Sequence, residues 1–140
     1  MNRDESAAKG RVDEVRGDDL ELTRHMAETA ARAAAGMFAK DVVIIDLREV
    51  VSYTDYFVVT SAETERQTRR IVDEVLEKMN EEGYKPRLRR VDQGSAWISL
   101  DFLDVVVHIF TDEARNYYRL ESLWRGAPQE RWEEQVRRPS

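Results

Sequence analysis

The hydrophobic and polar positions change their period along the chain, and each change predicts a new element. Residues 18–39 repeat apolar side chains at spacings of three and four, which predicts a helix with one buried stripe: Leu22, Met26, Ala30, Ala33 and Met37. Asp18 and Asp19 suit the positive end of that helix. Two continuous β-branched runs follow, at 42–47 and 56–60, and such runs are typical of strands covered on both faces.

The second half of the chain predicts two more helices and three more strands. A helix is expected over 64–82, ended by Gly83, with a buried face of Thr68, Ile71, Val75, Leu76 and Met79. The polar segment 85–92 indicates an edge strand, and the segments 96–102 and 104–110 indicate two inner strands. Thr111 can cap a last helix, Asp112–Trp124, which Gly126 and Pro128 end.

This order of elements predicts an α/β (α+β) fold, a mixed sheet of about five strands flanked by helices. Residues 1–17 lack aromatic side chains and a sustained apolar period, so a disordered or frayed N-terminal extension is expected there. The folded domain is expected over 18–128. Residues 129–140 then form a C-terminal tail, which can continue as a helix.

Composition narrows the classes of protein. The chain has 140 residues, of which 36% are charged, and a formal net charge of -6, so a broad basic face for nucleic acid is not expected. The absence of cysteine excludes disulfides and thiolate metal sites. No apolar run suits a signal peptide or a membrane helix, so a soluble, cytoplasmic protein is expected.

The segment from Asp101 to Trp124 carries the residues that suggest chemistry. Asp101 and Asp104 are three residues apart, so they do not share a strand face as a pair of metal-binding carboxylates would. His108 lies within a β-branched strand, where a core histidine is the more frequent occurrence. We therefore expect no catalytic residue, no metal and no cofactor, and keep a nucleotide-binding enzyme as the alternative.

The predicted helix Asp112–Trp124 raises a separate question about Glu121. At about 100° per residue, one helix face collects Ala114, Tyr117, Leu120, Glu121 and Trp124. A carboxylate within such a face needs a cation or a hydrogen-bond donor. Glu121 therefore either bonds internally, to His108 or an arginine, or faces a basic partner.

The position of Trp97 in its predicted strand favours the interpretation that this part of the chain is a binding surface. In the strand over 96–102, Ile98, Leu100 and Phe102 share the core face, while Trp97, Ser99 and Asp101 share the other. A tryptophan beside an acid is typical of an interaction hot spot with a polar rim. The other interpretation is that Trp97 caps a small cluster beneath a helix.

Several segments together resemble the ribosomal silencing factors, also called the Iojap-like family. The resemblance covers 27–128 and rests on four stretches: DLREVVSYTDYFVVTSA, TERQT, WISLDFLDVVVHIF and EARNYYRLESLW. Three departures are visible, of which the first is the charged extension before Asp18, which has no counterpart in the family. The glycine common between the two aspartates is Leu103 here, and the usual Glu-Gly pair before the tryptophan strand is absent.

The resemblance implies a function that residue patterns alone do not. Such factors bind the large ribosomal subunit through its ribosomal protein fourteen, block joining of the small subunit and repress translation. Their fold is similar to that of nucleotidyltransferases, without the catalytic carboxylates. A homodimer is expected for the free protein.

The predicted edge strand carries four cations, Lys85, Arg87, Arg89 and Arg90. We expect them to protect the strand edge against aggregation, and a minor contact with ribosomal RNA is the alternative.

Carried over position by position, the family motifs assign two groups of residues. The residues expected to contact the partner are Trp97, Asp101, Asp104, Tyr118, Glu121 and Trp124. The residues expected to support them structurally are Asp55, His108, Arg115, Leu120 and Leu123.

Overall fold

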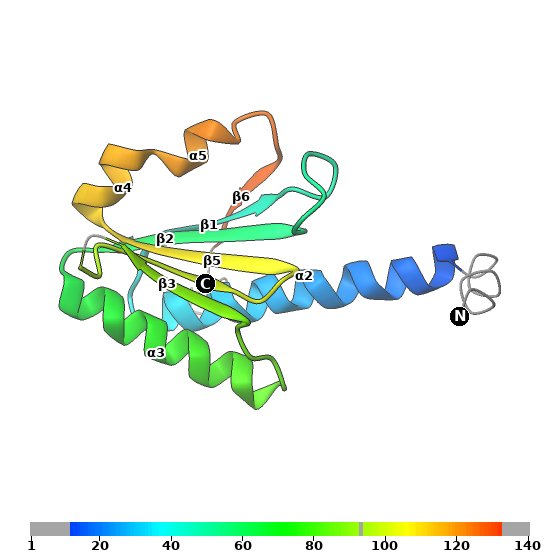
Figure 1. The fold of residues 1–140 in the computed structure, drawn as a ribbon, viewed down its shortest axis with the longest axis horizontal. Coiled ribbons are helices and arrows are strands. Elements are labelled where there is room, and N and C mark those ends of the chain that lie inside the picture. The colour runs from blue at the N-terminus through cyan, green and yellow to red at the C-terminus, as the bar shows by residue number, and fades with distance from the viewer. Residues whose placement is uncertain (1–11, 93, 133–140) are drawn as a thin grey trace, which may run out of the picture.

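A six-stranded mixed sheet between two layers of helices forms the centre of the molecule (Figure 1). The computed structural model describes residues 12–92 and 94–132. The elements in chain order are α2 (Val12–Gly36), β1 (Lys40–Asp46), β2 (Tyr56–Ala62), α3 (Glu65–Glu81), β3 (Leu88–Asp92), β4 (Trp97–Asp101), β5 (Val105–Thr111), α4 (Asp112–Tyr118), α5 (Leu120–Leu123) and β6 (Gln129–Arg131). The predicted α+β class is confirmed.

The strands are ordered β3-β4-β5-β2-β1-β6. The central pair, β2 and β5, is parallel, and every other neighbouring pair is antiparallel. The predicted β-branched runs become β1 and β2, and β2 is buried at each of its positions. A strand buried on both faces needs a helical layer on each side of the sheet.

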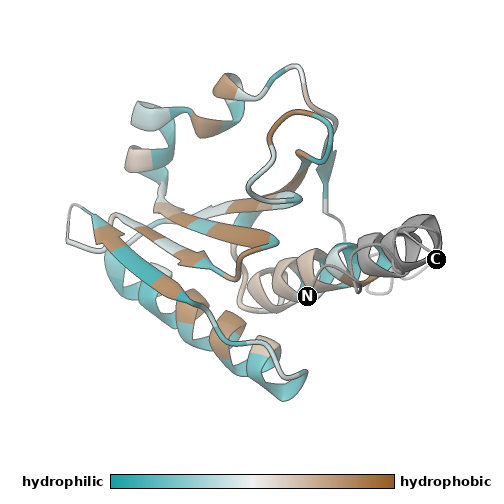
Figure 2. Cartoon of the chain, turned by 45° about the vertical axis from the view of Figure 1, so that its right-hand side comes forward, coloured by the Kyte–Doolittle hydropathy of each residue, from teal (hydrophilic) through white to brown (hydrophobic). Residues whose placement is uncertain are grey.

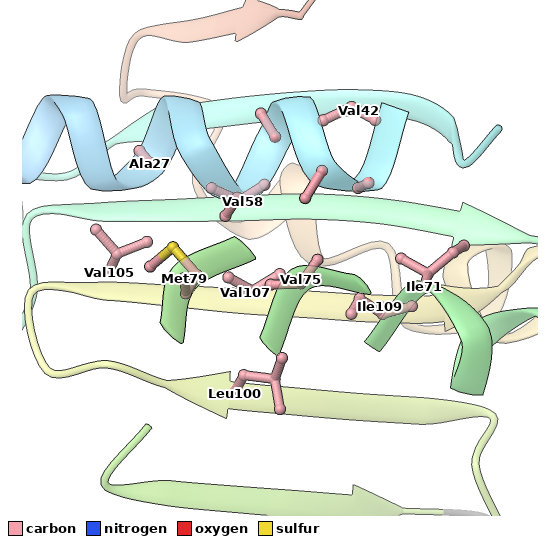
Figure 3. Packing of buried hydrophobic residues seen from close by; sticks show 14 of the residues in the cluster. Ala27, Val42, Val58, Ile71, Val75, Met79, Leu100, Val105, Val107 and Ile109 are labelled. Carbon is pink, nitrogen blue, oxygen red and sulfur yellow. The ribbon is translucent and has the colours of Figure 1, made fainter. Parts of the chain in front are cut away.

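One side of the sheet, which we call the closed face, is covered by α2 and α3. Its strand residues include Val58, Leu100 and Val107, all fully buried. In Figure 3, Ile71, Val75 and Met79 of α3 lie against the strands, with α2 beside them. The helix was expected to include Thr64, which instead caps α3 by accepting a hydrogen bond from the backbone N–H of Gln67.

The opposite side, which we call the half-open face, carries α4 and α5 (Figure 1). Phe57, Val59 and Phe110 are buried there beneath the two helices. The inner strand β4 shows how far the cover extends, because its residues alternate between half-buried and buried. Trp97, Ser99 and Asp101 are the half-buried positions and lie on this face, as the alternation predicts.

The predicted polar edge strand is confirmed as β3, although it begins at Leu88 rather than residue 85. All five of its residues are exposed. Charged side chains on an outer strand discourage pairing with another chain. In Figure 2 this strand and the outer side of α3 are largely hydrophilic, while the strands between the helical layers are mainly hydrophobic.

The start of the first helix was predicted wrongly. Helix α2 begins at Val12, not near Asp18, so the expected extension over 1–17 overlaps a helix; residues 1–11 lie outside the described part. Gly17 suggested a boundary, but a glycine inside a helix costs only about 1 kcal/mol. The first part of α2 projects beyond the sheet in Figure 1, and none of the described helices is long and apolar enough to cross a membrane.

The last helix was also predicted wrongly, because it is two helices. Arg119 takes the left-handed conformation, with φ 50° and ψ 52°, and separates α4 from α5. The single stripe expected from Ala114 to Trp124 is therefore broken: Ala114 and Leu120 are buried, whereas Tyr117 is 78% exposed. The predicted cap at Thr111 is confirmed by its hydrogen bond from the N–H of Ala114.

The C-terminal tail is not a helix where the structure describes it. Gln129–Arg131 form β6, antiparallel to β1. The domain therefore extends past residue 128 and has six strands rather than five. Residues 133–140 lie outside the described part.

Candidate functional site

The half-open face carries a continuous series of aromatic side chains, which we call the aromatic row: Tyr118, Trp97, His108, Phe57 and Trp124. Tyr118 and Trp97 have ring centroids 4.7 Å apart, and Trp97 also stacks on buried Phe110 at 4.9 Å. Strands β4, β5 and β2 each contribute one ring, α4 contributes Tyr118, and Trp124 directly follows α5. It runs across the part of the sheet where the helical cover becomes incomplete.

His108 is the centre of the row. Its Nδ1 accepts a hydrogen bond from the indole N–H of Trp97, at 3.2 Å, and its ring lies 4.5 Å from that of Phe57. Burial lowers the pKa of His108 to about 4, against a smaller raising influence of Asp101. The imidazole is therefore neutral at pH 7, and because Nδ1 accepts, its proton belongs on Nε2.

Trp124 ends the row above β2. It follows α5, and its ring lies edge-on to Phe57 at 6.0 Å. Its indole nitrogen and the Nε2 of His108 are both buried and have no hydrogen-bond partner among the described residues. Both nitrogens lie beneath the surface of this face, where an ordered water is the usual partner of such a donor.

Carboxylates lie beyond the end of the row where β4 meets β5. Asp101 accepts a hydrogen bond from the N–H of Leu103 at 2.7 Å and meets Arg87 at 3.4 Å. Asp104 is exposed, and its backbone oxygen accepts from the N–H of half-buried Asp55 at 2.8 Å. The two aspartates thus flank a tight turn, as the sequence spacing suggested.

At the other end of the row, Tyr118 borders a hollow of about 490 Å³. Two glutamates line it, Glu65 from α3 and Glu113 from α4, together with Tyr117 and Ala96. Aromatic and acidic walls suit a basic side chain, because the ring faces and the carboxylates both attract a cation. Acidic groups therefore lie at both ends of the aromatic row.

Glu121 is engaged internally, as one of the two interpretations from the sequence expected. Arg115 donates to its carboxylate from Nε, at 2.9 Å, and from a terminal nitrogen at 2.5 Å. The same guanidinium donates to the backbone oxygens of Lys40 and Asp41 and to Ser61. This clamp fixes α4 and α5 to the start of β1, on the same face of the sheet as Trp97 but nearer the opposite edge.

The structure thus divides the residues assigned from the sequence. Trp97, Tyr118 and Trp124 lie in one row, with Asp101 and Asp104 past its end, whereas Glu121 is held apart by Arg115. Among the supporting residues, Leu120 is buried, Asp55 is half-buried and Leu123 is 71% exposed. The sequence did not identify Phe57, whose ring contacts those of both His108 and Trp124. Its position in a β-branched strand predicted that it would be buried, but not which residues it would contact.

The side chains that this face presents are mainly aromatic rings and carboxylates. Within 12–92 and 94–132, no group of three or more histidine or acidic side chains could hold a metal ion. One carboxylate oxygen of Asp101 accepts from the N–H of Leu103, and the other meets the exposed guanidinium of Arg87 only at 3.4 Å. The fold and this face together describe a small α+β domain with an aromatic surface bordered by acids.

Comparison with known proteins identifies the family. The family described as "Ribosomal silencing factor during starvation" matches residues 21–140, and the chain belongs to it. The chain is 31% identical over 99 residues to Ribosomal silencing factor RsfS of Bacillus subtilis, covering 71% of this chain and 84% of that protein. It is 32% identical over 117 residues to the chloroplastic protein Iojap of Zea mays, covering 81% of this chain and 49% of that protein.

A solved structure supports the same assignment. A crystal structure of a protein from Bacillus halodurans is similar with a TM-score of 0.68 and 27% identity, covering 78% of this chain and 99% of that chain. The resemblance inferred from the motifs is therefore confirmed at the level of the family.

Proposed function

We propose that this protein binds the large ribosomal subunit through its ribosomal protein fourteen and thereby blocks joining of the small subunit. The relatives that are named ribosomal silencing factors support the ribosomal setting. The observation that carries the proposal is the aromatic row on the incompletely covered face, with acids at both ends. Repression of translation then needs only occupancy of the subunit surface, and no bond is made or broken.

The chemistry of this face suits a basic ribosomal protein. Half-buried aromatic side chains supply apolar contact area that is already held rigid by neighbouring rings, which lowers the entropic cost of binding. Carboxylates at the rim favour a cationic partner and steer its approach. We propose Trp97, Tyr118 and Trp124 as anchors, and Asp101 and Asp104 as the acidic rim.

Glu121 has a different role in this proposal. Its carboxylate is occupied by Arg115, so it supports docking by holding α5, and with it Trp124, in place. His108 is likewise a supporting residue, because its Nδ1 fixes the indole of Trp97. A charge-preserving change that keeps the clamp should therefore leave docking largely intact.

The decisive experiment measures subunit binding and subunit joining with matched variants. Tyr118→Ala and Asp104→Lys alter the proposed surface, while Tyr84→Ala and Glu77→Lys make the same changes on the α2–α3 side. Loss of an anchor should weaken cosedimentation with large subunits by roughly thirtyfold, since a hot-spot side chain contributes about 2 kcal/mol. The two control variants should bind and block joining like the wild type.

The outcome is interpretable only for folded variants, so circular dichroism accompanies each one. Equal inhibition by all four variants would place the docking site on another face. Saturable binding of ATP or CTP with magnesium, followed by turnover, would instead favour the nucleotide-binding alternative.

We also propose that the free protein forms a homodimer through the half-open face. Apolar side chains near that face, such as Leu123 and Tyr117, are largely exposed in the single chain, and a second copy would cover them. Docking and dimerisation would then compete. Light scattering at high micromolar concentration tests this, and a monomer there would contradict it.

A further inference from the structure

A second surface lies on the α2–α3 side of the molecule, where the end of α2 meets the start of α3. It is a groove of about 490 Å³ lined by Met37, Phe38, Thr64, Arg66, Gln67 and Arg70. None of these six residues is acidic, although the chain as a whole carries a net charge of -6. The groove belongs to neither the aromatic row nor the arginine clamp.

Phe38 is the first unusual feature of the groove. Its side chain is 79% exposed, and its backbone has a φ of 63°. A residue other than glycine in the left-handed region costs about 1–2 kcal/mol, and a bulky exposed ring gains no burial in return. Nothing within the described chain explains why phenylalanine, rather than glycine or asparagine, occupies this turn.

The arginines are the second unusual feature. Arg66 and Arg70 are four residues apart, so they lie on one side of α3, and neither forms an ion pair with a described residue. Other arginines of the chain do pair with acids, for example Arg24 with Glu28 and Arg48 with Asp46. Arg66 also lies in the first turn of α3, where the helix dipole disfavours a cation.

We propose that this groove binds a single-stranded RNA segment, with one base stacked on Phe38 and phosphates at Arg66 and Arg70. An exposed aromatic ring beside unpaired arginines combines the two interactions that hold single strands, base stacking and backbone neutralisation. A ring that stands out from the surface offers its face to a flat base more readily than it encloses a peptide side chain. The source of the RNA rests on the proposed function, in which the large subunit supplies it.

The edge strand β3 provides a matched control for this proposal. Arg89 and Arg90 are also exposed and form no ion pair with a described residue, but the residues of β3 are not part of the groove around Phe38. The double variants Arg66→Ala/Arg70→Ala and Arg89→Ala/Arg90→Ala therefore remove the same charge from two places. Only the first should affect a site built around Phe38.

The test measures fluorescence anisotropy of a labelled ten-nucleotide oligoadenylate with the full-length protein over a series of salt concentrations. Phe38→Ala should weaken binding roughly 5- to 150-fold with an unchanged salt slope, because stacking releases no counterions. Arg66→Ala/Arg70→Ala should make the slope of log affinity against log salt shallower by about 1.4, which corresponds to two phosphate contacts.

Several results would overturn the proposal: no binding by the wild type, an equal loss in the Arg89→Ala/Arg90→Ala variant, or tighter binding of an oligoglutamate peptide than of the oligonucleotide. All the altered side chains are exposed, so unfolding does not complicate the comparison. The assay contains no ribosome, and the cosedimentation assay contains no oligonucleotide. Failure of this inference and failure of the proposed function are therefore distinguishable.

Discussion

The two faces of the sheet differ in how completely helices cover them, although the same strands form both. On β4, Ile98 is fully buried on the closed face, and its neighbour Trp97 is half-buried on the half-open face. The closed face is filled by aliphatic side chains and alanines from two long helices. The half-open face is filled by rings and by the shorter helices α4 and α5.

This difference separates stability from recognition. The cluster of buried apolar residues under α2 and α3 is the larger of the two, so we expect it to contribute more to the free energy of unfolding. The ring nitrogens of His108 and Trp124 remain unpartnered within the described structure on the other face. Changes on the closed face should therefore act on unfolding, and changes on the half-open face mainly on binding.

The largest loss of stability should come from a substitution on the closed face. Ile98→Ala removes a fully buried side chain between the sheet and its helices, and should lower the free energy of unfolding by about 2–5 kcal/mol. Urea denaturation measures the loss. Folded Ile98→Ala should still bind large subunits with wild-type affinity, and a selective loss of binding would contradict the separation of the two faces.

A pH effect should come next, from His108. Its pKa is lowered to about 4 in the folded chain by burial, whereas an unfolded histidine titrates near pH 6.5. The unfolded state therefore binds more protons below pH 6.5, so this contribution to stability is present above that pH and is lost as the pH falls toward 4. The loss amounts to roughly 3 kcal/mol.

Two variants isolate the histidine from other titrating groups. His108→Asn should flatten the dependence of the unfolding free energy on pH between 7 and 5, relative to the wild type. Trp97→Phe removes the N–H that favours the neutral ring, so the pKa of His108 should rise. Carbon and proton shifts of the imidazole, followed by NMR during titration, would refute the assignment if the ring titrated normally in the wild type.

Loss of the arginine clamp should have an intermediate effect. Arg115→Ala leaves the carboxylate of Glu121, whose side chain is 25% exposed, without its cation and removes donors from Lys40 and Ser61. A cost of about 2 kcal/mol is expected, since the pair is only partly buried. Hydrogen exchange should show faster opening of α4 and α5 than of α3, and uniform acceleration would argue against a local role.

The smallest predicted change is an increase in stability. Leu103 has a φ of 79° in the turn between β4 and β5 and is 48% exposed. Leu103→Gly should relieve the strain of the left-handed conformation and stabilise the fold by up to about 1 kcal/mol. The thermal midpoint measures this gain, and a lower midpoint would mean that the leucine side chain makes contacts worth more than the strain.

The sequence predicted those parts of the fold that side-chain pattern controls. The β-branched runs of β1 and β2 and the alternation of Trp97 with Ile98 each identified a strand and its faces. The break at Arg119 could not be predicted, because no glycine or proline interrupts Asp112–Trp124 and tertiary bonds from Arg115 favour the turn. Strand β6 gave no signal either, since its three exposed polar residues join the sheet through their backbone.

The candidate site was predictable to a similar degree. The alternation in β4 placed Trp97 and Asp101 on one face without any knowledge of other strands. The contact of Trp97 with His108 depends on the register of β4 against β5, and that of Phe57 with His108 depends on the parallel pairing of β2 with β5. Registers between distant segments follow from the whole fold, so local pattern does not reveal them.

Strand β6 also has a consequence for the order in which the molecule is made. The other five strands are synthesised before it, so the outer edge of β1 keeps its backbone groups unpaired until Gln129–Arg131 follow. An open strand edge can pair with another nascent chain. Pairing of β6 with β1 therefore covers an edge that the earlier strands leave open, and it ties the segment carrying α4 and α5 to the sheet at its second end.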